Sequence, residues 1–348
     1  MRIKRTLPLV LALVIVAAAV TIAVQLRKHA PPEAARLLPG GDAFFYVNLS
    51  WVRKTATGNS LPAVSHDPGY EHFIQETGIE FERDLDAAAF SVHYPAKWPG
   101  GGTGGSAPEP RFSEVFVGKF QGEKLTNYLR QIAKAVENYE SVDIFTIPLE
   151  DRRFRVAVLS VDSVAASNHD DPSVIRGIVD RSRRLASPFA GPALLRHYYK
   201  RVQFASPVWL VAHVQPSAPE FGGWGAVFAR PANVVISASY GPMHLPLRPG
   251  SIHLRGEALT DSPEDAHAIA EKLGVFLRMF HAAEVGSGGN DPDVKAAFDS
   301  LQVQQDGERA VLTATIPPGF LRKLFSDTSA AELPLPGAAS PPSAAQKK

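Results

Sequence analysis

Two glycine-rich segments have compositions that occur in phosphate-binding and catalytic loops. Residues 100–105 read Gly-Gly-Gly-Thr-Gly-Gly, and glycine lets backbone N–H groups approach a phosphate closely. A phosphate loop connects a strand directly to a helix, whereas this segment continues into residues 106–108 and another predicted strand. Gly286-Ser287-Gly288-Gly289 is similar to a serine-hydrolase elbow, but the G-x-S-x-G pattern requires glycine where Val285 stands. We therefore interpret both segments as loops.

Histidine and carboxylate residues near position 70 are the next candidates for chemistry. His66, Asp67, Glu71 and His72 are close in sequence, but they do not form an H-E-x-x-H pattern, and we interpret them as exposed polar residues. His213 lies within an apolar strand and is predicted to be a satisfied core histidine. The chain has no cysteine, which excludes thiolate metal sites, iron–sulfur clusters and thiol nucleophiles. We predict no catalytic residue, no metal site and no cofactor.

Two groups of arginines could bind phosphate or carboxylate groups, because a guanidinium forms paired hydrogen bonds with such anions. A solvated helix face explains the same residues equally well, since acidic residues such as Asp180 lie among them. The net charge of +1 argues against nucleic-acid binding. The candidates for an anionic glycan or lipid partner are Arg152, Arg153, Arg155, Arg181, Arg183 and Arg184, with Arg196, Lys200 and Arg201 on a neighbouring helix.

The N-terminal segment determines on which side of a membrane these residues lie. From Leu7 to Val24 the chain has 18 residues without a charged side chain, which is about 27 Å of helix and close to the hydrocarbon thickness of a bilayer. Arg2, Lys4 and Arg5 precede this run and favour a cytoplasmic N-terminus. We predict a single-pass signal anchor with the body in the periplasm or outside the cell. The alternative is a signal peptide cut near Ala17–Ala19, which would give a secreted protein.

Elements of the first half follow from apolar periodicity and turn residues. A helix from Pro68 to Thr77 is expected to end at Gly78, and the spacing of apolar residues predicts another helix over Glu123–Val136. Asp171 and Pro172 are an N-cap and first-turn proline for a further helix to about Leu185, and Pro192 begins one that reaches Val202. The predicted strands are Ala43–Leu49, Ala88–Tyr94, Phe112–Phe120, Val142–Ile147, Phe154–Leu159 and Val164–Ser167.

A similar order of elements follows in the second half. The capping box Ser262–Asp265 is expected to start a long helix, whose apolar face would include Ala266, Ile269, Leu273, Phe276, Leu277 and Phe280. Asp306-Gly307 predicts a hairpin turn between the last two strands. The predicted strands are Val208–Val214, Asn233–Tyr240, Ser251–Ala258, Leu301–Gln305 and Ala310–Ile316. The order β-β-β-α-β-β therefore occurs twice, which indicates an internal duplication.

The predicted fold class is α+β, with two similar halves whose mostly antiparallel sheets are flanked by helices after one N-terminal transmembrane helix. The expected regions are a signal anchor at 1–28, a linker at 29–41, a first half at 42–203 with a flexible Gly/Pro loop at 98–110, a second half at 204–326, and a disordered Pro/Ala-rich tail at 327–348.

The arrangement resembles uncharacterised bacterial proteins that carry a signal anchor followed by duplicated α+β halves and are known only as domains of unknown function. The resemblance depends on Leu38-Pro39-Gly40-Gly41-Asp42-Ala43, Asp171-Pro172-Ser173-Val174-Ile175 with Pro192-Ala193-Leu194-Leu195, and Pro207-Val208-Trp209-Leu210. These segments cover roughly half of the body and contain no catalytic motif. The resemblance implies an exported, membrane-tethered protein and supplies no reaction or ligand.

These observations favour a non-enzymatic, membrane-anchored protein that binds or scaffolds a partner in the bacterial cell envelope. One alternative is an exported hydrolase without a recognisable motif. Another is a protein that binds an apolar ligand in a cleft between the halves, because domain interfaces are common ligand sites. Convergent titratable groups in one cleft would favour the hydrolase, a deep apolar pocket would favour the ligand-binding protein, and the absence of both would favour the scaffold.

Overall fold

The computed structural model describes residues 30–56, 66–93, 110–149, 152–183, 191–216, 227–240, 251–286 and 291–320. Its helices are α2 (Glu33–Leu37), α3 (Leu49–Ala56), α4 (Pro68–Thr77), α5 (Phe81–Asp84), α6 (Gly122–Ile132), α7 (Ser173–Ser182), α8 (Ala193–Tyr198), the 3-10 helix η1 (Tyr199–Arg201), α9 (Pro263–Gly286) and α10 (Pro292–Asp299). Its strands are β1 (Ala43–Asn48), β2 (Leu85–His93), β3 (Arg111–Gly118), β4 (Ala135–Tyr139), β5 (Val142–Leu149), β6 (Arg152–Val158), β7 (Ser163–Ser167), β8 (Val208–Val214), β9 (Ala232–Tyr240), β10 (Ile252–Leu259), β11 (Gln302–Asp306) and β12 (Arg309–Ile316).

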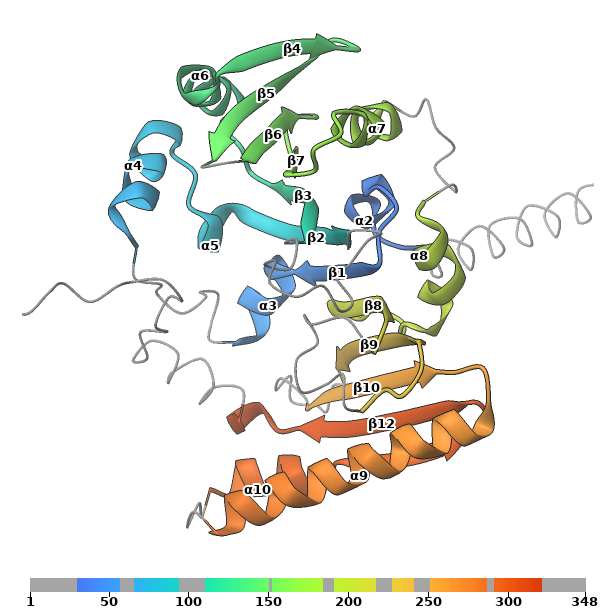
Figure 1. Ribbon diagram of the computed structural model, residues 1–348. Helices are drawn as coiled ribbons and strands as arrows, with labels where there is room; N and C mark the ends of the chain where they lie inside the picture. The colour runs from blue at the N-terminus through green and yellow to red at the C-terminus, as the bar shows by residue number, and fades with distance from the viewer. Residues whose placement is uncertain are drawn as a thin grey trace, which may run out of the picture.

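In the described part of the chain, twelve strands form one continuous sheet in the order β11-β12-β10-β9-β8-β1-β2-β3-β7-β6-β5-β4 (Figure 1). Each neighbouring pair is antiparallel. The predicted α+β class with antiparallel strands is confirmed. The halves share one sheet instead of having one each, because Ala43–Val47 of β1 pairs with Val208–Ala212 of β8.

The two faces of the sheet carry different helices, since successive residues of a strand point to opposite sides. Figure 1 shows α2, α7 and α8 on one side and α4 and α6 on the other. The face under α2 holds the largest apolar cluster, and each large side chain buried there contributes about 1.5–3 kcal/mol. On the opposite face, Leu125 and Leu129 of α6 pack near one end of the sheet, and Ile269 of α9 packs near the other. Fully buried members of the α2-face cluster are Trp209, Phe44, Ile144, Ile175, Ile178, Leu195 and Val115.

Helix α2 (Glu33–Leu37) lies within the segment 29–41 that was predicted to be a linker, and this part of the segment is packed against the sheet. Ala34 and Ala35 within this helix and Leu38 after it are 3%, 0% and 1% exposed and belong to the largest apolar cluster. The small alanine side chains let the helix approach β2 and β3 closely. The composition of Pro31-Pro32-Glu33-Ala34-Ala35 resembles that of a tether, but tertiary packing makes this segment part of the core.

Helix α6 is shorter than the predicted helix over Glu123–Val136. It ends at Ile132, and Ala133 is already extended. Val136 lies in β4 opposite Phe145 of β5, because the backbone bond from Lys134 N to Thr146 O begins a hairpin ladder. With β4 included, four strands (β4 to β7) follow α6 in the first half, whereas two (β11 and β12) follow α9 and α10 in the described part of the second half. The two halves therefore differ in element order after α6 and α9, and α3, α4 and α5 between β1 and β2 have no counterpart among the described residues between β8 and β9.

The long helix α9 begins after Ser262, the N-cap residue of the predicted capping box. Ser262 Oγ accepts a hydrogen bond from Asp265 N at 3.1 Å and donates to Asp265 Oδ2 at 2.9 Å. Ser262→Ala is expected to lower the free energy of unfolding by about 1 kcal/mol, because two polar groups of the first turn lose their partner. Urea unfolding monitored by circular dichroism measures this loss. Ser262→Asp retains an acceptor at the cap and serves as the control; equal losses in both variants would contradict the capping role.

Several predicted regions lie outside the described residues. These are the anchor from Leu7 to Val24, residues 98–109 of the Gly/Pro loop, residues 287–289 of the glycine–serine segment, and the tail at 327–348. Among the helices of the described ranges, none is both long enough and apolar enough to cross a membrane.

Candidate functional site

The two arginine groups predicted to contact an anionic partner have separate structural surroundings. Arg155 is 6% exposed and donates to the backbone oxygens of His169 and Asp170 at 2.7 and 3.2 Å. Its role is to hold the segment that follows β7.

The second arginine group lies at the end of α7. Arg181 Nε donates to Leu37 O at 2.7 Å, and burial lowers the pKa of Arg181. Arg183 donates to Ser141 O, and Arg184 lies outside the described residues. Arg152 and Arg153 are on β6 beside β5. Arg155, Arg181 and Arg183 thus donate to different backbone carbonyls, and anion binding by Arg152 and Arg153 stays a prediction.

The histidine–carboxylate group near position 70 connects two helices. His66 Nδ1 is 2.8 Å from Glu71 Oε1, and its Nε2 is 3.6 Å from Glu82 Oε1. The hydrogen bond to Glu71 raises the pKa of His66. Tyr70 donates to Glu82 at 2.7 Å and accepts from Phe81 N. These contacts hold α4 against α5, and no group of three or more metal-ligating side chains is present in the described ranges.

Two serines lie within hydrogen-bond distance of a histidine at the end of β2. His93 Nε2 is 3.3 Å from both Ser91 Oγ and Ser113 Oγ. Burial and the nearby His169 lower the pKa of His93 to about 4, so the ring is neutral near pH 7. A serine nucleophile must be reached by its substrate, yet Ser91 and Ser113 are both 0% exposed. This group therefore satisfies polar atoms between strands and does not favour a hydrolase.

His213 is hydrogen-bonded, as predicted, but it is half-buried and not part of the core. Its Nδ1 lies 3.0 Å from Asn233 Oδ1 on β9.

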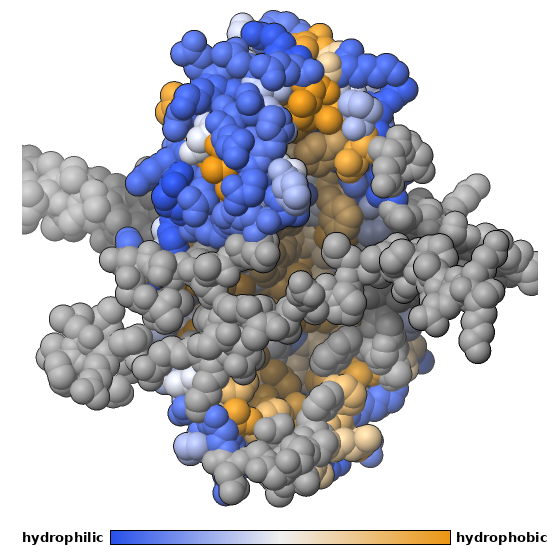
Figure 2. Space-filling model, turned by 90° about the vertical axis from the view of Figure 1, so that its left-hand side faces the viewer, coloured by the Kyte–Doolittle hydropathy of each residue, from blue (hydrophilic) through white to orange (hydrophobic). Residues whose placement is uncertain are grey.

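An apolar row crosses the middle of the sheet on the face opposite α2. Ile236, Leu210, Phe45 and Phe90 are directly opposite one another on β9, β8, β1 and β2. Phe45 and Ile236 are each 36% exposed, although a buried position is usual for side chains of this size in a central strand. Figure 2 shows hydrophobic residues in a recessed band that continues from the upper to the lower half of this side of the molecule. We call these four residues the apolar row.

Aromatic contacts continue the row across the next strands. The rings of Phe45 and Phe90 are 6.1 Å apart, and that of Phe116 on β3 meets Phe90 edge-on at 5.8 Å. On the next strand, β7, the same face is covered by α6, because Leu125 and Leu129 of α6 belong to one apolar cluster with Ala166 of β7. On the other side, Gly256 of β10 lies opposite Ile236 and adds no side chain. The surface of the row is thus covered by α6 towards β7, whereas next to Ile236 no side chain projects from Gly256.

Glu114 of β3 is the titratable group that continues the row, since it lies directly opposite Phe90. Burial against these apolar neighbours raises the pKa of its carboxyl to about 7 because the charged form loses hydration. Near neutral pH this side chain is present in both charged and neutral forms. The hydrocarbon surface of the apolar row is therefore bordered by one carboxyl group, that of Glu114, whose charge changes in the physiological pH range.

The fold and the row define an α+β protein with a single antiparallel sheet and a partly open apolar face. No protein-family model matches the chain, and no curated protein matches it. Among solved structures, crystal form III of TP0453 is similar with a TM-score of 0.42 and 9% identity, over 87% of this chain and 99% of that chain. Crystal form IV of TP0453 has a TM-score of 0.39 and 8% identity, over 87% and 98%. These values describe a weak overall similarity.

Proposed function

We propose that this chain is a non-enzymatic binding protein of the cell envelope whose apolar row binds the acyl chains of lipids. The observation that carries the proposal is the exposure of Phe45 and Ile236 in two central strands of the sheet. Binding a hydrocarbon chain would remove this apolar surface from water, which contributes about 25 cal/mol per Å² of buried area. The predicted anchor from Leu7 to Val24 would keep the body close to such lipids, with the body outside the cytoplasm.

The chemistry of the row favours a hydrocarbon over a peptide segment. The side chains of Ile236, Leu210, Phe45 and Phe90 carry no polar atom, and their backbone groups belong to ladders with strands on both sides. A peptide placed on this surface would leave its own N–H and C=O groups without partners. An acyl chain has no such groups to satisfy.

We also propose that the sheet arose by duplication of one α+β half. From the central pair outward, the first three strands are β1, β2 and β3 on one side and β8, β9 and β10 on the other. A helix follows the third strand in each case, α6 in the first half and α9 in the second. The apolar row then crosses the boundary between the two halves, in agreement with an apolar ligand held between them.

Photolabelling of the full chain in its own membranes tests the acyl-chain proposal. Cells that express the chain are supplied with a diazirine-bearing fatty acid, irradiated, and the labelled peptides are identified by mass spectrometry. Label is expected in β1, β2, β8 and β9. In the variant Phe45→Ala with Phe90→Ala, labelling there is expected to fall about tenfold or more, because each lost phenyl group contributes about 1.5–3 kcal/mol.

The matched control removes two exposed apolar side chains elsewhere. Val161 and Phe204 are 84% and 66% exposed and lie outside the strands, so Val161→Ala with Phe204→Ala is expected to leave the labelling unchanged. Label on residues 7–24 reports contact of the anchor with lipid and serves as the internal reference. Label confined to residues 7–24, or equal labelling in the phenylalanine variant, would contradict the proposal.

A further inference from the structure

A buried carboxylate on the α2 face is surrounded by three arginines. Glu257 of β10 is 5% exposed. Arg255, two residues earlier on the same strand face, approaches Glu257 Oε1 at 2.7 and 2.8 Å. Arg201 of η1 and Arg309 of β12 approach Oε2 at 3.2 and 3.7 Å, and Arg309 also pairs with Asp306. Three guanidinium groups thus meet two carboxylates, which leaves one formal positive charge.

This arginine cluster has more donors than its carboxylates can accept. A guanidinium has about five N–H donors, and a carboxylate accepts about four hydrogen bonds. Arg255 contacts Glu257 through Nε and one terminal nitrogen, and Arg201 through a single terminal nitrogen. The side chains of Arg201, Arg255 and Arg309 remain 30%, 35% and 30% exposed. Charge and hydrogen-bond donors are therefore available to a further anion.

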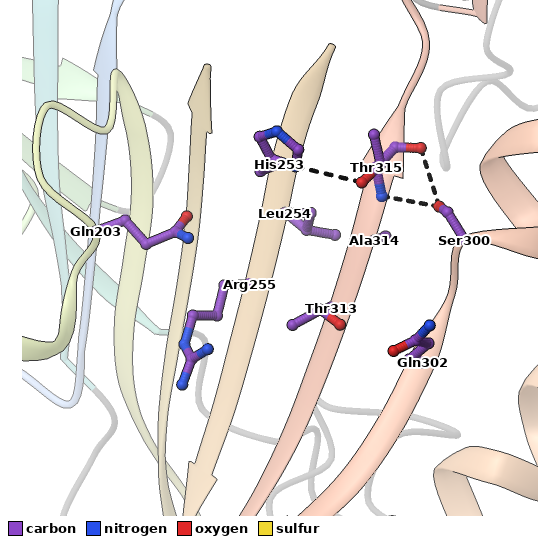
Figure 3. Close-up of a pocket in the computed structure, with 9 residues that line it drawn as sticks. All are labelled: Gln203, His253, Leu254, Arg255, Ser300, Gln302, Thr313, Ala314 and Thr315. Atoms are coloured by element: carbon purple, nitrogen blue, oxygen red, sulfur yellow. Dashed lines mark hydrogen bonds between the residues drawn. The ribbon is translucent and has the colours of Figure 1, made fainter. Parts of the chain in front are cut away.

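A pocket of about 370 Å³ with a mixed polar and apolar lining includes Arg255 of the cluster among its lining residues. Figure 3 shows its lining side chains coming from β10, β12, the segment at Ser300 and Gln302, and the segment at Gln203 before β8. His253 Nδ1 lies 3.3 Å from Thr315 Oγ1, and Ser300 Oγ donates to Thr315 O and accepts from Thr315 N. The other polar side chains of the lining are those of Gln203, Gln302 and Thr313. Hydroxyl and amide groups therefore extend the surface that begins at the guanidinium.

We propose that this pocket binds a hydroxylated anion of the acidic-sugar class, with its carboxylate on Arg255 and its hydroxyl groups towards Thr313 and Gln302. The volume exceeds what a single small ion needs, because a water molecule takes about 30 Å³ in the liquid. The lining combines hydroxyl and amide groups with apolar surface at Leu254 and Ala314, which suits a sugar ring with its hydroxyl groups and C–H faces. Arg255 offers the paired N–H donors that match a carboxylate.

This pocket is independent of the apolar row. Arg255 pairs across the ladder with Ser237 of β9, which belongs to the α2 face, whereas Ile236 of the row points to the opposite face. Failure of one proposal therefore leaves the other intact.

Isothermal titration calorimetry on the full chain in detergent micelles tests the proposal with glucuronate, glucose and inorganic phosphate as probes. Glucuronate is expected to bind. Glucose is expected to bind at least about tenfold more weakly, because it has no carboxylate for Arg255. Phosphate is also expected to bind at least about tenfold more weakly, because it lacks the hydroxyl-bearing ring. Arg255→Gln is expected to weaken glucuronate about tenfold or more. Arg111→Gln is the control: Arg111, like Arg255, lies on a strand and pairs with a carboxylate, here the exposed Asp170, but it does not line the pocket, so this variant should bind glucuronate as the parent does.

Thr313→Val and Gln302→Leu retain the arginine cluster and separate a binding role from a folding role. Both variants are expected to weaken glucuronate while leaving phosphate unchanged. Circular dichroism establishes that each variant is folded. Equal affinity for glucose and glucuronate, equal affinity for phosphate and glucuronate, or unchanged glucuronate binding in folded Arg255→Gln would each overturn the proposal, as would the absence of glucuronate binding to the parent chain.

Discussion

Trp209→Ala is expected to lower the free energy of unfolding by about 3–5 kcal/mol, the usual cost of removing a large aromatic side chain from a core. Trp209 is 1% exposed and lies in the central strand β8. Its ring stacks on Tyr46 of β1 at 5.5 Å and meets Tyr199 edge-on at 5.2 Å. The substitution would leave a cavity where the two halves of the sheet join and where η1 packs.

Urea-induced unfolding, followed by circular dichroism, measures this change. Trp209→Phe is expected to cost less than Trp209→Ala, because it keeps an aromatic ring and removes the indole Nε1–H, which is buried without a hydrogen-bond partner. Val161→Ala removes an apolar side chain that is 84% exposed and should change stability by less than about 0.5 kcal/mol. A loss below about 1 kcal/mol for Trp209→Ala would show that the core does not depend on this ring.

Glu114→Gln is expected to stabilise the protein by about 3–4 kcal/mol at pH 8 and to have little effect at pH 4. Burial raises the pKa of Glu114 from 4.5 to about 7, so the folded state holds the proton more tightly than the unfolded state. The stabilising contribution of that proton is complete below pH 4.5, declines as the pH rises towards 7, and is lost above it. Each unit by which the pKa differs between the folded and unfolded states corresponds to about 1.4 kcal/mol of free energy of unfolding.

The pH dependence of unfolding for the parent and the variant measures this effect. The two stability curves should coincide at low pH and separate between about pH 4.5 and 7. Glu308→Gln is the control, because Glu308 is an exposed residue of the turn between β11 and β12, and it should leave the curve unchanged. Parallel curves for Glu114→Gln and the parent over the whole range would contradict a raised pKa in the folded protein.

Local sequence signals predicted the strands well, because their evidence lies within short segments. Phe45, Phe90, Leu210 and Ile236 all fall inside predicted strands that the structure contains. Their alignment in one row could not be predicted, because it depends on the register between strands that are distant in sequence. A shift of one residue in any of these ladders would turn a side chain to the other face.

Only part of the arginine cluster could be predicted from the sequence, because some of its contacts are local and others join segments that are distant in sequence. Arg255 and Glu257 are two residues apart in a predicted strand, so their shared face follows from the strand period. Arg201 was among the basic residues noted in the sequence, but its contact with Glu257 depends on how η1 packs. Arg309 joins them because β12 pairs with β10. Among the described candidates, Arg155, Arg181 and Arg183 contact separate parts of the backbone, because proximity in sequence alone does not bring side chains into one pocket.

The pairing of β1 with β8 has a consequence for how the chain assembles during synthesis. One side of β1 is matched by β2, whose residues follow within about fifty positions, whereas its other side has no matching strand until residues 208–214 leave the ribosome. Contacts so distant in sequence form slowly, and an unmatched strand in the meantime is a template for association with other chains. During early folding the unpaired edge of Ala43–Asn48 would therefore stay exposed, and a chaperone that shields this edge would raise the yield of native protein.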